Sequence, residues 1–482
     1  MIHFCLENHE YLNDVQTGIQ IFYPNRHYYK CDEIQKEGIT VVSSMFDNKC
    51  TAELYENGVK TAEGFEEFEP SDKKAKKRSV RNSIYNMLTK KTGFYPKWGT
   101  ITGVRPAKTA GELMAQGYSE EETVKYFMEK HFTSRQKALL AVEVSKAEEK
   151  ILSQNSDEYV SLYVGIPFCP TRCLYCSFTS YPLERYSKMV DKYLDKLTEE
   201  IKYTAQLAKG RKFMSVYVGG GTPTSLNASQ LERLLSCIAE NINLSEVREF
   251  TVEAGRPDTI TEEKLLVMKK YGVERISINP QTMNQKTLDL IGRRHSVEDI
   301  KSVYKTARKI GFKDINMDLI LGLPNETVED VENTMRQMEI LSPDSMTVHT
   351  LAVKRASRLK EQFDSFDLAE AETMEKMINI SSECARKMGL SPYYMYRQKN
   401  MVGNFENVGY CRKGCEGIYN IEIMEERQTI LAVGAGSTTK VYNSKKNLLT
   451  RAFNVKSVEE YISRFDEMLE RKKTALETEK SL

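Results

Sequence analysis

Six short runs of apolar residues, rich in valine and isoleucine, recur between residues 158 and 352, and amphipathic helical stretches separate them. Continuous apolar runs of this length are typical of strands that are buried on both faces of a parallel sheet. The strands are expected at residues 160–166, 215–220, 249–254, 275–279, 315–321 and 345–350. Strand–helix units in series predict an α/β fold, and right-handed crossovers curl the sheet toward a barrel. Because a complete barrel has eight units, we expect a partial six-stranded parallel (β/α)6 barrel with an open side.

The segment before the barrel has two patterns. Residues 1–70 alternate apolar and polar positions in short runs, which predicts a strand-rich N-terminal unit. Residues 71–157 have helical periodicity, and the basic run at 73–78 is expected to be a solvated linker or the start of a helix. Pro106 is suited to the start of another helix, where a missing amide costs nothing. Together these parts form a predicted N-terminal α+β extension, of which 71–157 is a helical linker domain.

The segment after the barrel, residues 353–482, again mixes helical and strand patterns. Helices are expected around 369–388 and from 457, and strands at 428–434 and 448–453. We interpret this segment as a C-terminal α+β domain that covers the barrel at 158–352.

The charge balance and the apolar content narrow the class of protein. Lys and Arg number 69 and Asp and Glu number 68 among the 482 residues, so the net charge is +1. This balance argues against a general nucleic-acid binder. No apolar run approaches the ~18 residues of a membrane span, and the N-terminus has no basic start followed by an apolar stretch. We therefore expect a cytoplasmic protein with no nucleic-acid partner and no membrane span.

Three of the ten cysteines form a compact motif in the loop after the first predicted barrel strand: Cys169-Pro-Thr-Arg-Cys173-Leu-Tyr-Cys176. Three thiolates can bind three corners of a cubane [4Fe–4S] cluster and leave one iron open for a substrate or cosubstrate. The alternative is a structural zinc site, which requires four ligands, but residues 177–200 contain neither Cys nor His. The spacing therefore favours iron–sulfur over zinc.

Polar and glycine residues follow the predicted strands, at the end of a β/α barrel where reactive groups gather. Glycines let a backbone approach a ligand closely and offer it amides, and a charged residue within an apolar strand needs a partner. A tight turn or a structural ion pair would explain any one of these residues equally well. The set comprises Gly219–Thr222, Glu253, Gln281, the run Arg293-Arg294-His295, Asp318 and His349.

The motifs IPFC-x3-C-x2-C, GGGTPT, Pro-Gln-Thr at 280–282, GRRH at 292–295 and MDLILGLP together resemble one branch of the radical S-adenosylmethionine (SAM) superfamily. That branch is the oxygen-independent coproporphyrinogen III oxidase (coproporphyrinogen dehydrogenase) family, in a divergent long subgroup. The resemblance covers about 158–352, and the C-terminal part more loosely. It implies a [4Fe–4S] cluster held by the three motif cysteines, together with SAM. The residues that match the family's SAM site are Tyr163, Gly220, Gly221, Thr222, Glu253, Gln281, Arg293, Asp318 and Ala352.

The family reaction removes two propionate carboxyls of coproporphyrinogen III as CO2 and leaves vinyl groups, which gives protoporphyrinogen IX. The resemblance thus implies a monomeric enzyme with a tetrapyrrole substrate and a low-potential electron donor such as flavodoxin or ferredoxin. A substrate with four carboxylates needs basic partners. The candidates by position are Arg172, Lys354, Arg355, Arg358 and Arg397, although surface charge explains each equally well.

Two departures leave alternatives open. The best-known oxidases continue the cysteine motif as Cys-x-Cys, whereas Cys176 is followed by Ser177 and Phe178, and an aromatic residue there also occurs in haem-chaperone relatives. A haem chaperone is therefore one alternative, although the chain lacks that group's HNPxYW motif. An anaerobic haem-opening radical enzyme is another. The pair Cys411 and Cys415 has no third ligand nearby, so we do not expect a second metal site there.

Overall fold

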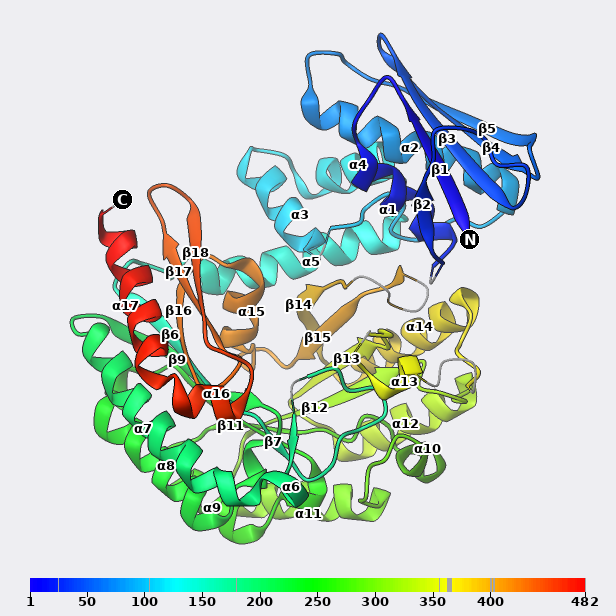
Figure 1. Ribbon diagram of the computed structural model, residues 1–482. Coiled ribbons are helices and arrows are strands. Elements are labelled where there is room, and N and C mark those ends of the chain that lie inside the picture. Colours follow the sequence, from blue (N-terminus) through cyan, green and yellow to red (C-terminus); the bar gives the residue numbers. More distant parts are fainter. Residues whose placement is uncertain are drawn as a thin grey trace. The chain divides into compact units, whose positions relative to one another are not determined.

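The computed structural model describes residues 1–24, 26–103, 105–178, 180–354, 356–361, 366–398, 401 and 404–481 (Figure 1). The chain divides into two compact units, which are described separately. The N-terminal unit comprises Met1–Glu143 and Arg397–Phe405, and the barrel unit comprises Val144–Tyr396 and Glu406–Leu482. Among the described residues, no helix combines the length and the apolar character that a bilayer crossing requires.

The N-terminal unit is built on a five-stranded sheet in the order β2-β1-β3-β4-β5. Its strands are β1 (Ile2–Glu7), β2 (Tyr28–Lys30), β3 (Ile39–Phe46), β4 (Lys49–Glu56) and β5 (Val59–Glu67). The apolar sides of β1, β3 and β4 pack with helices α1 (Leu12–Phe22) and α2 (Lys73–Thr92) in one buried core. The basic run at 73–78 forms the first turns of α2, and the side chain of Asp72 caps that helix. The expectation of a helix start is confirmed.

Three further helices follow α2. They are α3 (Pro106–Ala115), α4 (Glu120–His131) and α5 (Arg135–Leu152). Pro106 occupies the first turn of α3, as expected from its fixed φ and missing amide. A capping box between Ser119 and Glu122 begins α4.

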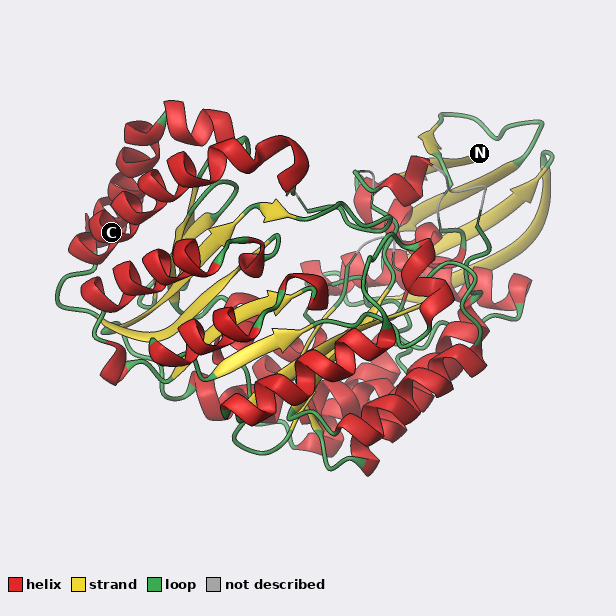
Figure 2. Ribbon diagram, turned by 90° about the horizontal axis from the view of Figure 1, so that it is seen from below, coloured by secondary structure: helices red, strands yellow, loops and turns green. Residues whose placement is uncertain are grey.

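All six predicted strands form in the barrel unit and pair in parallel, in chain order. They are β6 (Tyr159–Ile166), β9 (Lys212–Gly220), β10 (Glu249–Gly255), β11 (Arg275–Ile278), β12 (Asp314–Leu321) and β13 (Ser345–Thr350). The connecting helices lie along the outer side of the curved sheet in Figure 1 and Figure 2. They are α6 (Leu183–Tyr186), α7 (Val190–Leu207), α8 (Ala228–Asn241), α9 (Glu262–Lys270), α10 (Gln285–Leu290), α11 (Val297–Ile310) and α12 (Val328–Leu341). The partial parallel β/α barrel is confirmed.

Residues after 352 add strands to both edges of this sheet. At one edge β15 (Asn407–Cys411) pairs antiparallel with β13, and β14 (Ser391–Tyr396) pairs with β15. At the other edge β16 (Thr429–Val433) runs parallel to β6, and β17 (Thr438–Asn443) and β18 (Leu448–Phe453) follow. The eleven-stranded sheet therefore ends in β14 and β18 and does not close. The remaining helices are α13 (Arg358–Glu361), α14 (Ala371–Lys387), α15 (Ile418–Glu425), α16 (Val458–Ser463) and α17 (Phe465–Ser481).

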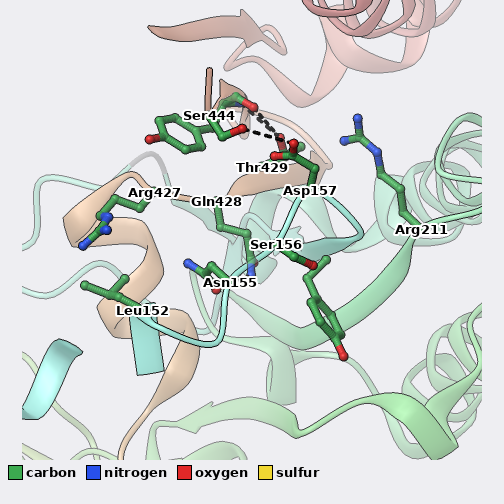
Figure 3. Close-up of a pocket in the computed structure, with 11 residues that line it drawn as sticks. Leu152, Asn155, Ser156, Asp157, Arg211, Arg427, Gln428, Thr429 and Ser444 are labelled. Atoms are coloured by element: carbon green, nitrogen blue, oxygen red, sulfur yellow. Dashed lines mark hydrogen bonds between the residues drawn. The ribbon is translucent and has the colours of Figure 1, made fainter. Parts of the chain in front are cut away.

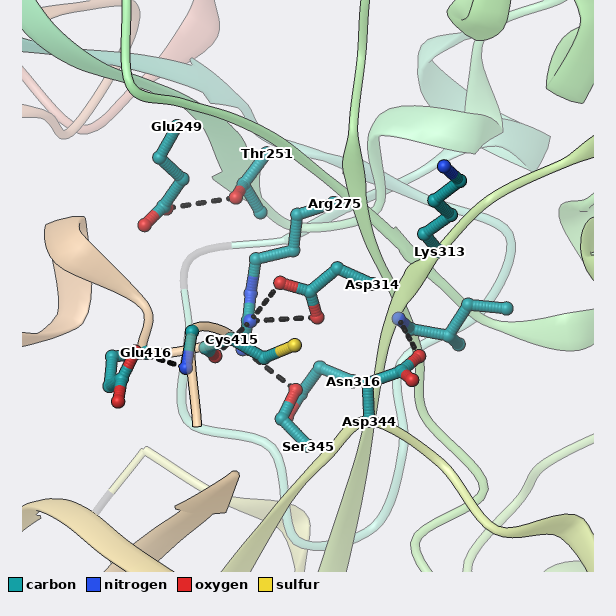
Figure 4. Close-up of polar contacts among 12 residues, drawn as sticks. Glu249, Thr251, Arg275, Lys313, Asp314, Asn316, Asp344, Ser345, Cys415 and Glu416 are labelled. Carbon is teal, nitrogen blue, oxygen red and sulfur yellow. Dashed lines mark hydrogen bonds and ion pairs between the residues drawn. The ribbon is translucent and has the colours of Figure 1, made fainter. Parts of the chain in front are cut away.

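A buried polar network joins the amino-terminal ends of four barrel strands (Figure 4). Arg275, the first residue of β11, donates to both carboxylate oxygens of Asp314 at 2.9 and 2.7 Å and to Ser345 Oγ at 2.9 Å. It also donates to the carbonyl of Cys415 at 2.9 Å. Glu249 accepts from the backbone amide of Ile418 at the start of α15. Because buried charges must be paired, this network fixes the strands at their amino ends and holds the C-terminal segment against them.

Candidate functional site

The cysteine motif lies in the loop at 167–178, the cysteine loop, at the carboxyl end of β6. Cys169 ends the short strand β7 (Phe168–Cys169), which pairs with β8 (Tyr181–Pro182). Cys169 and Cys173 are buried, and Cys176 is partly exposed. The amide of Leu174 donates to the carbonyl of Ile291 at 3.0 Å, so the loop is tied to the segment after α10.

The three thiols share one electrostatic environment. The pKa of Cys169 is raised to about 11, chiefly by burial; a hydrogen bond with Thr222 opposes the rise, and the neighbouring Cys176 and Cys173 add to it. Burial also raises the pKa of Cys176. Metal ligation requires thiolates, so Cys169 and Cys176 need a strong positive centre to ionise. Among the described residues, no three Cys, His, Asp or Glu side chains converge on a position that could hold one metal ion.

Glu253 lies near the end of β10, beside the glycine run. Tyr217 donates to its Oε1 at 2.5 Å. Burial raises the pKa of Glu253 to about 7; the hydrogen bond from Tyr217 opposes the rise, and the charge of Asp318 adds to it. A carboxyl group with this pKa gains from a nearby cation, because a cation stabilises the charged form.

Asp318 and Gln281 are joined through the backbone of neighbouring strands. Gln281 donates its amide to the Asp318 carbonyl at 2.9 Å, and its φ of 69° is uncommon for a residue other than glycine. Its side-chain Oε1 is buried and has no hydrogen-bond partner. Asn316 donates to Asp318 Oδ1 at 2.7 Å, and His349 Nε2 lies 3.9 Å from Oδ2. Burial raises the pKa of Asp318, but His349 and Asn316 outweigh burial and lower it below its ordinary value.

Arg293 reaches the same end of the barrel from the loop after α10. It is buried, and it donates to the Asn279 carbonyl at 2.5 Å and to the hydroxyl of Tyr175 at 3.2 Å. Tyr175 belongs to the cysteine loop, so Arg293 connects that loop with the end of β11. Its Nε is buried without a hydrogen-bond partner. A guanidinium edge of this kind is suited to a carboxylate.

The glycine run packs against the backbone that leads into the cysteine loop. A Cβ on Gly221 would lie 2.7 Å from the carbonyl oxygen of Phe168, and Gly220 has a φ of +111°. The amides of Gly221 and Thr222 donate to the carbonyls of Ile166 and Phe168 at 2.7 and 2.8 Å. The expectation that the run offers free amides to a ligand is therefore wrong for these two amides. They hold β7 beside β9, and Thr222 Oγ1 lies 3.4 Å from Cys169 Sγ.

Tyr163 and Ala352 complete the predicted set. Tyr163 on β6 stacks with Tyr419, at a ring-centroid distance of 5.8 Å, and Tyr419 stacks with Tyr217 at 4.3 Å. Ala352 follows β13 and is partly exposed. The structure thus brings Glu253, Asp318 and Tyr163 together beside Tyr217, which is partly exposed, and Tyr419, which is buried.

The basic candidates differ in their surroundings. Arg172 of the cysteine loop donates to the carbonyl of Ala356, and Leu359 N donates to the Leu174 carbonyl at 2.9 Å. The segment that carries Lys354 and Arg358 therefore lies against the cysteine loop. Arg355 lies outside the described residues. Arg397 is instead buried in the N-terminal unit, where it donates to the Ile101 and Asn404 carbonyls and lies over the Trp98 ring. Those contacts explain Arg397 as a structural residue of that unit.

Sequence reasoning missed Arg256. It follows β10 and donates to the Thr171 hydroxyl at 2.7 Å, and its Nη1 lies 3.8 Å from Cys173 Sγ. Asp258 accepts from the other side of the same guanidinium at 2.9 and 2.7 Å. The available signal was an Arg-Pro-Asp run three residues after Glu253, at a barrel strand end.

Two other features lie away from this end of the barrel. A polar pocket lined by Asp157, Arg211, Arg427 and Ser444, among others, lies beside the amino-terminal ends of β6 and β16 (Figure 3). Reactive groups of β/α barrels gather at the opposite strand ends, so we assign this pocket no catalytic role.

Cys411 is buried in β15, and burial raises the pKa of Cys415 to about 11.

Comparison with known proteins agrees with this geometry. The family model described as the radical SAM superfamily matches residues 163–338. The coproporphyrinogen III oxidase HemN from Escherichia coli has a similar fold, with a TM-score of 0.55 and 24% identity over 67% of this chain and 73% of that chain.

Two Bacillus subtilis (strain 168) proteins are similar in sequence. The oxygen-independent coproporphyrinogen-III oxidase-like protein HemZ is 40% identical over 410 residues, which is 83% of this chain and 82% of HemZ. The heme chaperone HemW is 31% identical over 305 residues, which is 63% of this chain and 75% of HemW. The chain therefore belongs to the radical SAM superfamily and, within it, to the family that contains HemZ and HemW.

Proposed function

We propose that this radical SAM protein is an enzyme of tetrapyrrole metabolism that oxidatively decarboxylates the propionates of coproporphyrinogen III to vinyl groups, giving protoporphyrinogen IX. The observation that carries the proposal is one juxtaposition. A loop with three thiols lies at the end of the barrel where Glu253 and Asp318 stand on strands and Arg293 stands on the loop after α10. The chain is also 40% identical to an oxidase-like relative over most of its length.

The residues fit the cofactors that radical SAM proteins use, a [4Fe–4S] cluster and SAM. Cys169, Cys173 and Cys176 would hold three irons and leave the fourth open. Cysteine sulfur is the donor that iron–sulfur clusters take, and this one loop carries three such side chains. The side-chain Oε1 of Gln281 and the Nε of Arg293 are buried without partners. Unpaired buried polar atoms are costly, so they support a polar ligand at this position.

When bound, the cluster and SAM would supply the one-electron chemistry that removes a hydrogen atom from the β-carbon of a propionate. The protein binds and orients the reactants. Arg293 would pair with the cosubstrate carboxylate, and Glu253 and Asp318 would accept hydrogen bonds from its amino and ribose hydroxyl groups. Tyr163 is partly buried and stacks with Tyr419, and its ring would restrict water near the reacting groups.

The substrate's carboxylates would meet the basic side chains around the cysteine loop. Arg172, Lys354 and Arg358 are carried by two segments that are hydrogen-bonded to each other. Burial lowers the pKa of Lys354, and a substrate carboxylate beside it would restore the charged form. A low-potential donor such as flavodoxin or ferredoxin would supply one electron for each cleavage of SAM. An electron acceptor would take one electron from the substrate as each carboxyl group leaves as CO2 and the vinyl group forms.

A haem chaperone is the second candidate. It is favoured by 31% identity to HemW over 63% of this chain and by Phe178, whose side chain is 71% exposed directly after the cysteine motif. An exposed aromatic ring next to a cluster could contact a flat macrocycle in either function. A decarboxylase removes carboxyl groups from the macrocycle, whereas a chaperone binds haem without changing it. Product analysis therefore distinguishes the two candidates.

The test is an anaerobic assay with coproporphyrinogen III, SAM and reductant, after reconstitution with iron and sulfide. We expect CO2 and protoporphyrinogen IX from the wild type, and neither product nor the brown iron chromophore from Cys173→Ala. Cys237→Ala, which alters a buried cysteine of α8, is the control and should keep both. Wild-type protein that loads iron but binds haem stoichiometrically and releases no CO2 would refute the decarboxylase and support the chaperone.

A further inference from the structure

Arg256 is a buried cation that points at the cysteine loop. Its side chain lies at the end of β10 and is only 3% exposed. Its Nη1 donates to the hydroxyl and the carbonyl of Thr171 at 2.7 and 3.2 Å, and to the Cys173 sulfur at 3.8 Å. One nitrogen therefore contacts both the backbone of the loop and the central cysteine of the motif.

Asp258 holds the guanidinium in this orientation. Asp258 accepts from Arg256 Nε at 2.9 Å and from Nη2 at 2.7 Å, which is the two-bond geometry that fixes a guanidinium plane. His295 Nδ1 lies 3.6 Å from Asp258 Oδ1, the oxygen that accepts from Arg256 Nε, and the histidine ring is buried. Because Asp258 occupies the Nε and Nη2 edge, the Nη1 hydrogens face Thr171 and Cys173.

Pairing with Asp258 alone explains why a buried arginine is tolerated, but not why it faces a sulfur. We propose that Arg256 is a positioning residue that sets the shape of the cysteine loop and raises the reduction potential of the cluster bound there. The inference rests on the proposed cluster ligation by Cys173. Reduction adds one negative charge to the cluster and its thiolates, and a hydrogen-bonded cation stabilises the more negative state.

The test compares the reconstituted wild type with Arg256→Gln and Arg256→Lys under anaerobic conditions. Arg233→Gln is the control, since it removes an arginine from an exposed ion pair on α8. Two properties are measured: iron and sulfide per chain, and the midpoint potential from an EPR-monitored redox titration. Neither readout depends on turnover.

We expect about four iron atoms per chain in the wild type and in Arg233→Gln, with equal potentials. In Arg256→Gln the ratio of reduced to oxidised cluster at a fixed potential should fall about tenfold, which is a shift of 59 mV to more negative values for one electron. Arg256→Lys keeps the charge but cannot bond Thr171, Asp258 and the sulfur together, so its potential should fall between the two.

An Arg256→Gln variant that loads iron fully and titrates with the wild-type potential overturns the inference while the proposed function stands. If Arg256→Gln fails to load, the potential is measured on Arg256→Lys, and an unchanged value there overturns it equally. Wild-type protein that takes up neither iron nor sulfide overturns the ligation itself, and the inference with it.

Discussion

The carboxyl group of Glu253 provides a direct test of the proposed SAM site. Its pKa is raised to about 7, chiefly by burial, so the group is largely neutral below that pH and ionised above it. SAM carries a net positive charge and would donate a hydrogen bond to Glu253, and both interactions are stronger with the ionised carboxylate than with the neutral carboxyl group. The affinity for SAM should therefore rise with pH through this value, and fall as acidification neutralises the group.

The size of the effect follows from the titration. One pH unit below its pKa about a tenth of the carboxyl groups are ionised, and one unit above it about nine tenths are. If only the ionised form binds, the dissociation constant should change about tenfold between about pH 6 and pH 8, or about 1.4 kcal/mol. Tyr217 donates to the same carboxylate at 2.5 Å and would keep it oriented in both states.

Equilibrium dialysis of anaerobic, reconstituted protein against labelled SAM measures this dependence. The amino group of SAM also titrates near this range, so Glu253→Gln serves as the matched control and reports that contribution alone. We expect Glu253→Gln to bind more weakly at the higher pH and to lose the tenfold change. The same pH profile in both proteins would show that Glu253 does not face the cosubstrate.

Three further predictions concern stability. Lys472→Met removes the cationic partner that lies 2.8 Å from buried Glu200, so it should lower the free energy of unfolding by about 3–5 kcal/mol. The double variant Lys472→Met/Glu200→Gln should recover part of this loss. Chemical denaturation measures both variants. Equal losses in both variants would contradict the ion-pair explanation. Gly221→Ala places a Cβ 2.7 Å from the Phe168 carbonyl oxygen, so it should lower the free energy of unfolding by about 1–3 kcal/mol and reduce iron uptake. Thermal unfolding and iron analysis measure the two effects, and normal iron uptake would count against the packing role. Trp98→Ala should lower the free energy of unfolding by about 3–5 kcal/mol, because the side chain is only 1% exposed. Hydrogen exchange should show reduced amide protection in the N-terminal unit and not in the barrel unit.

Much of the barrel could be predicted because its signals are local. Each of the six strands is an apolar run flanked by turns, and each helix repeats its apolar positions every three or four residues. The order of such units along the chain implies parallel pairing with right-handed crossovers. The cysteine motif is local too, since three thiols within eight residues can meet in one loop without help from the rest of the chain. Their role as cluster ligands stays a prediction until iron uptake is measured.

Contacts between distant segments carried no such signal. Nothing in the run at 428–434 says that β16 pairs with β6, because strand pairing depends on which edge is left open once the sheet has formed. The glycines after β9 suggested free amides, but two of those amides are used by the backbone beside the cysteine loop.

The amino-acid pattern alone was thus enough for the parallel strands, the helices between them and the thiol-rich loop, because periodicity and spacing act over a few residues. The tertiary structure was needed for the eleven-stranded sheet with both its edges, for the unpaired atoms of Gln281 and Arg293, and for the placement of Arg256 beside Cys173, which is 83 positions away in the chain. These features arise when the folded chain brings remote groups within hydrogen-bonding distance and removes water from around them.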